Sequence, residues 1–116
     1  MGLDTFASCA PGNVVLSDED EGAFDAAGLE LCGGMHSGDG GSFRGKVYAE
    51  LILDVTGVSL YEEWIPPEVV REMAAALEAC DPEAVAEPGT PPGAVRDIAR
   101  FFRVCADRGL GLVGWW

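Results

Sequence analysis

The chain has 116 residues, 48% of them hydrophobic, which predicts one compact domain over residues 1–116. Its 20 acidic and 7 basic side chains give a formal net charge of −13, which argues against a nucleic-acid-binding protein and against attachment to an anionic membrane. No stretch is long and apolar enough to predict a membrane span, and the first residues do not have the pattern of a secretory signal. We therefore expect a cytoplasmic protein with reduced thiols.

The first third of the chain predicts short strands and one short helix. Residues 3–9 and 13–16 flank an Ala-Pro-Gly-Asn turn and are predicted strands, paired as a hairpin or forming separate edges. Ser17 precedes four acidic residues and is expected to cap a helix that ends at Gly28. Residues 29–32 predict a strand that enters a glycine-rich loop.

The rest of the chain predicts three helices and a final strand. The first helix, from Phe43 to Thr56, is expected to be capped by Ser42 and to bury Val47, Tyr48, Leu51, Ile52 and Val55. The second begins at Pro66-Pro67 and ends at Asp81-Pro82, before an exposed loop over residues 83–92. Thr90 is expected to cap the third, which runs to about Arg108. With a strand at residues 110–116, the predicted fold is α+β, with three to four short strands packed against about four helices.

Residues 32–46 are the strongest candidate site, because the only histidine and the first two basic residues share this glycine-rich stretch. Gly40, Gly45 and Lys46 match the start of a phosphate-binding loop. However, Val47 stands where Ser or Thr should bind magnesium, and the preceding residues do not form the required strand. Nucleotide hydrolysis is therefore not expected.

A ligand site of another kind is still predicted in this stretch. Arg44 and Lys46 lie at an expected helix N-terminus, which attracts anions, and His36 and Asp39 precede them. We interpret these four residues as a possible site for an anion or another small ligand. The alternative is that both basic side chains only pair with nearby acids.

Cysteine and histidine raise a further possibility. Cys32, His36 and Cys9 could bind zinc if carboxylates completed the site, whereas Cys80 and Cys105 are expected in the core. Cys32 and His36 could instead be the nucleophile and base of a thiol enzyme. No cofactor is expected on balance, and zinc is the alternative.

Two features suggest interaction surfaces. Trp115 and Trp116 end the chain, and either fold back onto the core or build a homo-oligomer interface. One stripe of the last helix, turned away from the core, carries Arg96, Arg100 and Arg103. We expect it to be a solvated face with Asp97 and Asp107 interleaved, and the alternative is a site for an acidic patch or an anion.

Four segments resemble short prokaryotic proteins of uncharacterised activity: Met-Gly-Leu-Asp at the start, Ser-Phe-Arg-Gly-Lys-Val-Tyr at residues 42–48, Ser-Leu-Tyr-Glu-Glu-Trp-Ile-Pro-Pro at 59–67, and the ending Gly-Leu-Val-Gly-Trp-Trp. The resemblance covers most of the chain and implies no particular activity, fold or catalytic residue. From the residues we expect a binding or interaction module that forms a homo-oligomer. The alternatives are a small metal- or thiol-dependent enzyme, and an acidic inhibitor or antitoxin-like protein that binds a basic partner.

Overall fold

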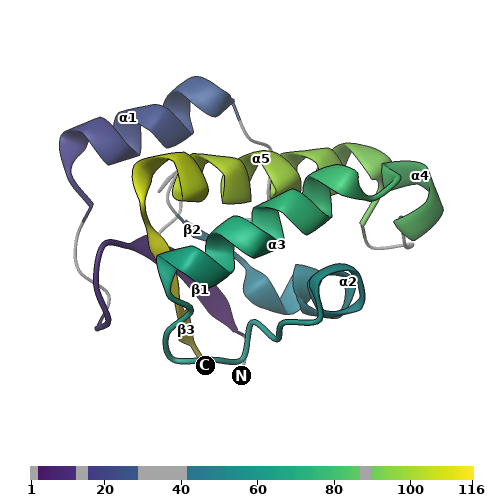
Figure 1. Ribbon diagram of the computed structural model, residues 1–116, viewed down its shortest axis with the longest axis horizontal. Helices are drawn as coiled ribbons and strands as arrows, with labels where there is room; N and C mark the ends of the chain where they lie inside the picture. Colours follow the sequence, from purple (N-terminus) through teal and green to yellow (C-terminus); the bar gives the residue numbers. More distant parts are fainter. Residues whose placement is uncertain (1–2, 13–15, 29–41, 87–89) are drawn as a thin grey trace.

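The computed structural model describes residues 3–12, 16–28, 42–86 and 90–116. These residues form a three-stranded antiparallel sheet and five helices, which confirms the predicted α+β fold (Figure 1). The strand expected at residues 29–32 lies outside the described residues, as does most of the one expected at 13–16. Among the described helices, none has both the length and the apolar character that crossing a membrane requires.

The sheet has the order β2-β1-β3, so the first strand of the chain lies in its centre. Strand β1 (Asp4–Ser8) pairs with β2 (Ser42–Phe43) on one edge and with β3 (Gly111–Trp115) on the other. The register places Asp4 opposite Trp115, so the two ends of the described chain lie side by side (Figure 1). The expected N-terminal and C-terminal strands are both confirmed.

Alternation along the strands gives the sheet two different faces. One face packs against the helices and supplies Leu3, Ala7 and Leu112 to the main hydrophobic core. The other face carries Phe6 and Val113, which are buried outside that core cluster, and Trp115, which is half exposed. The helices therefore cover one face, and on the second face the half-exposed side chain is that of Trp115.

Helix α1 (Asp18–Ala27) has the boundaries that its sequence predicts. The Ser17 hydroxyl accepts a hydrogen bond from the Asp20 amide at 3.2 Å. Gly28 ends the helix with a φ of 62°, a conformation that favours glycine. Phe24 fixes the helix to the core through ring contact with Phe101, at a centroid distance of 4.9 Å.

Helix α2 (Gly45–Thr56) begins later than expected, because Ser42 and Phe43 belong to β2 and Ser42 is not the cap. Phe43 lies opposite Thr5 in the sheet and packs edge-on against Phe101, with ring centroids 4.8 Å apart. This long-range packing decides the conformation of Phe43. The expected apolar face is correct except at its ends, since Val47 is 41% exposed and Val55 is only partly buried.

Helices α3 (Pro67–Ala79) and α5 (Pro92–Arg108) run side by side and form the largest helix contact (Figure 1). Two boundary predictions are wrong between them. A short helix, α4 (Pro82–Val85), occupies part of the expected loop, capped by the Asp81 side chain. Thr90 is buried and does not cap α5, whose first turn begins after Pro91 without a side-chain cap.

Candidate binding site

The site lies where the chain after α2 crosses the edge of the C-terminal strand. Ile65 and Leu112 exchange two backbone hydrogen bonds, of 2.8 and 2.9 Å. The Gly114 amide donates a third to the Glu62 carbonyl at 3.1 Å. Residues 62–65 therefore cover the outer edge of β3 and hold the side chains of Glu63 and Trp64 next to the sheet.

Two glycines of β3 permit this close approach. A Cβ at Gly111 would overlap the Ile65 carbonyl oxygen and lie 2.5 Å from Cη2 of Trp64. A Cβ at Gly114 would overlap the Glu62 carbonyl oxygen. Any larger residue at either position would push the covering segment away, so the glycines of the last strand are required by packing.

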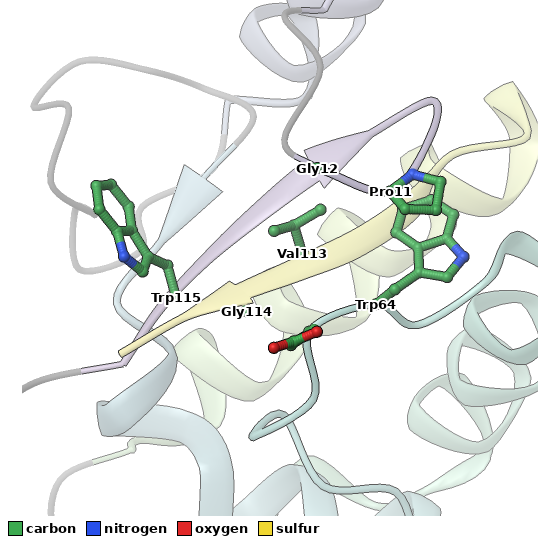
Figure 2. Close-up of a pocket in the computed structure, with 7 residues that line it drawn as sticks. Pro11, Gly12, Trp64, Val113, Gly114 and Trp115 are labelled. Atoms are coloured by element: carbon green, nitrogen blue, oxygen red, sulfur yellow. The ribbon is translucent and has the colours of Figure 1, made fainter.

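A hollow of about 440 Å³ lies on the face of β3 that the helices leave uncovered (Figure 2). Figure 2 shows Trp115 at one end, Trp64 at the other and Val113 between them. The lining is mostly apolar, and Glu63 is its acidic residue. The described residues that line the hollow include Pro11, Glu63, Trp64, Val113, Gly114 and Trp115. A volume of roughly 300–1,000 Å³ with an apolar lining and few polar groups is usual for a ligand site.

The Trp115 end of the hollow is formed by a half-exposed indole. Trp115 is 51% exposed, although its ring lies 6.4 Å from that of Phe6. Asp4 is the cross-strand neighbour of Trp115, so the two side chains share a face of the sheet. Asp4 is only 6% exposed and is not among the described residues that line the hollow, and its Oδ1 has no hydrogen-bond donor among the described residues.

The Trp64 end of the hollow holds a second indole. Trp64 is half buried, and its indole lies over Gly111. Glu63 is exposed and precedes it in the chain, and Pro11, from the turn after β1, also borders the hollow. The hollow therefore has an indole at each end and one carboxylate, that of Glu63, among the described residues of its lining, an arrangement that attracts positively charged groups.

The last residue of the chain does not share this hollow. Trp116 is 49% exposed and packs against the ring of Tyr61 at a centroid distance of 5.7 Å. Trp115 and Trp116 were expected either to fold back or to build an interface together. Both remain half exposed and contact different neighbours: Trp115 borders the hollow, and Trp116 is not among the described residues that line it. Their part in an interface between copies of the chain stays a prediction, and Trp116 provides a natural control for the hollow.

Arg100 and Arg103 of the arginine stripe are engaged in ion pairs, as expected for a solvated face. Arg100 pairs with Asp97 at 3.4 Å, and Arg103 pairs with Asp107 at 3.6 Å. Arg103 also binds Glu78. That hydrogen bond lowers the pKa of the Glu78 carboxyl below its ordinary value. The stripe therefore contributes to the contact between α3 and α5.

Arg44 and Lys46 both lie exposed at the start of α2. The Lys46 amide donates to the Leu3 carbonyl at 3.1 Å, and the Val47 amide to the Arg44 carbonyl at 3.1 Å. Two amides of this helix terminus are thus already used within the protein. His36, Asp39 and Cys32, the other residues of the predicted sites, lie outside the described residues.

Cys9 is exposed just beyond β1, at the opposite end of that strand from Arg44. Along the strand direction, Cys9 and Arg44 are five residues apart, a distance of about 16 Å. Within the described ranges, no three His, Cys, Asp or Glu side chains group as metal ligands would. Cys105 is fully buried as predicted, whereas Cys80 is only partly buried, and burial raises the pKa of both thiols.

The hollow was not among the sites predicted from the sequence. Its residues come from three separate segments: the turn after β1, residues 63–64, and β3. The one local signal was the exposed aromatic ending of the chain, which pointed to Trp115 but not to its partner Trp64. Finding the partner requires knowing that residues 62–65 run beside β3.

Comparison with known proteins adds no relative to this description. No protein-family model matches the chain, and neither the curated proteins nor the solved structures include a significant match.

Proposed function

We propose that this chain is a binding module that holds a basic segment of a partner protein in the hollow between Trp64 and Trp115. The observation that carries the proposal is an apolar hollow with an indole at each end and the Glu63 carboxylate in its lining. A cation over the face of a tryptophan gains about 0.5–1 kcal/mol when exposed and about 2 kcal/mol when desolvated. The Glu63 carboxylate in the lining adds a favourable charge interaction.

The charge of the whole protein supports a basic partner over a second copy of the chain. A net charge of −13 attracts cationic segments and accelerates their association. A second copy would bring the same negative charge to the interface. Three of its arginines, Arg100, Arg103 and Arg108, are already paired with acids of their own chain.

Calorimetric titration with a lysine-rich peptide tests the proposal, with a glutamate-rich peptide of equal length as the control probe. We expect the lysine peptide alone to bind, and to bind more weakly as the salt concentration rises. Trp64→Leu and Trp115→Leu should each weaken binding about five- to thirtyfold, the equivalent of about 1–2 kcal/mol. Trp116→Leu should leave the affinity unchanged, and circular dichroism checks that each variant is folded.

Two results would refute the proposal. One is equal affinity of the wild type and the two hollow variants for the lysine peptide. The other is a chain that does not bind the peptide; if that chain also forms a dimer that Trp115→Leu dissociates, a second copy occupies the hollow. Sedimentation at several protein concentrations detects that dimer.

A further inference from the structure

The spacing of the hollow along β3 limits the kind of basic segment that can fill it. Gly111, Val113 and Trp115 alternate onto the same face of the strand. The indole of Trp64 lies over Gly111, four residues from Trp115. Four strand residues span about 13 Å, so this is the approximate separation between the two ends of the hollow.

An extended peptide has the same repeat as the strand beneath it. Its side chains at positions i, i+2 and i+4 lie on one face, with i and i+4 about 13 Å apart. Val113, 8% exposed, lies between the two indoles and offers an apolar surface to the middle position. A helical segment would bring its i and i+4 side chains only about 6 Å apart, too short to reach both indoles.

Resting on the proposed function, we infer that the hollow recognises an extended partner segment of the pattern basic-x-apolar-x-basic. The first and last side chains lie against the two indoles, and the Glu63 carboxylate in the lining attracts them. The middle side chain is small and apolar and packs on Val113. Recognition therefore depends on the spacing of two positive charges and not only on their number.

Two peptides of equal composition test this spacing. The first, Ser-Lys-Thr-Val-Thr-Lys-Ser, places its lysines at i and i+4 around valine. The second, Ser-Lys-Lys-Thr-Val-Thr-Ser, has adjacent lysines, which an extended chain directs to opposite faces. We expect the second peptide to bind about five- to thirtyfold more weakly, since only one ammonium group then reaches an indole. Heteronuclear NMR titration to millimolar concentration measures both affinities.

A pair of neighbouring carboxylates gives a matched control. Glu63 borders the hollow. Glu62 accepts a hydrogen bond from β3 through its backbone carbonyl and is not among the described residues that line the hollow. Glu63→Gln should weaken the first peptide severalfold more than Glu62→Gln, although both variants lose one negative charge. An equal effect of the two variants would overturn the assignment of Glu63 as a contact.

The outcomes separate this inference from the proposed function. Equal affinity for the two peptides, with binding still dependent on Trp64 and Trp115, would overturn the spacing and leave the basic-segment function standing. Binding of neither peptide would overturn both. Tighter binding of the first peptide that disappears in Trp115→Leu is the result that supports the inference.

Discussion

Replacing Gly45 with alanine is expected to destabilise the protein, although alanine normally stabilises a helix. A Cβ at this position would overlap Oγ1 of Thr5 and lie 3.0 Å from Cγ and Cδ2 of Leu3. Both neighbours are buried, and Thr5 is held in the central strand of the sheet, which is paired on both edges. Moving Oγ1 aside therefore requires a change of the Thr5 χ1 rotamer within a closely packed interior. Overpacking of this kind costs about 1–3 kcal/mol.

The expected size follows from two opposing effects. Alanine returns at most about 1 kcal/mol through its helix propensity, so the net loss should be at most about 2 kcal/mol. For a chain of this length, that corresponds to a fall in Tm of up to about 8 °C. Gly22→Ala is the matched control, because Gly22 lies in α1 with no atom within 4 Å of its Cβ position. This variant should gain about 0.5–1 kcal/mol.

Urea unfolding followed by circular dichroism measures the free energy of unfolding of both variants. A double-mutant cycle then assigns the cause, because Thr5→Ala removes the Oγ1 atom that the new Cβ would overlap. Gly45→Ala should cost less in that background. The reasoning is refuted if Gly45→Ala is as stable as Gly22→Ala, or if its cost is the same with and without Thr5→Ala.

Three further predictions follow from packing and charge. Gly114→Ala should destabilise the protein by about 1–3 kcal/mol in urea unfolding, because the new Cβ would lie against two backbone carbonyl oxygens; an unchanged unfolding midpoint would contradict this. Because Arg103 lowers the pKa of Glu78, their pair stabilises the protein above the unfolded-state pKa of that carboxyl and loses its effect as the pH falls through the lowered folded value. Arg103→Gln should therefore be slightly less stable than the wild type at neutral pH and equally stable in strong acid, and a difference that persists in acid would exclude this cause. Iodoacetamide should label exposed Cys9 in the native protein but Cys105 only after unfolding, since burial raises the thiol pKa of Cys105 and blocks access; mass spectrometry of digested protein reads this out, and native labelling of Cys105 would contradict it.

Local signals in the sequence were sufficient where a neighbouring residue decides the structure. The hydroxyl of Ser17 and the left-handed conformation of Gly28 act within one turn of α1, and both boundaries of that helix are confirmed. The apolar face of α5 was also predictable, because its buried residues repeat with the helical period. These features depend on residues close together in the chain.

The predictions were wrong where distant contacts outweigh local preference. Ser42 is a good helix cap and Phe43 fits a helix, but pairing with β1 and packing on Phe101 place both in a strand. The hollow follows the same rule, because Trp64 and Trp115 are 51 positions apart in the printed sequence and border the same hollow only when residues 62–65 cover β3. Neither the hydrophobic period nor a sequence motif predicts that residues 62–65 lie beside β3.

NMR of the tryptophan indoles tests the central claim most directly. The chain has three tryptophans, and each indole N–H gives its own signal in a ¹⁵N-labelled sample. During titration with the lysine peptide of matched spacing, the signals of Trp64 and Trp115 should move together with a single binding curve, while that of Trp116 stays in place. If no indole signal moves, or if Trp116 moves while the other two do not, the hollow is not the binding site.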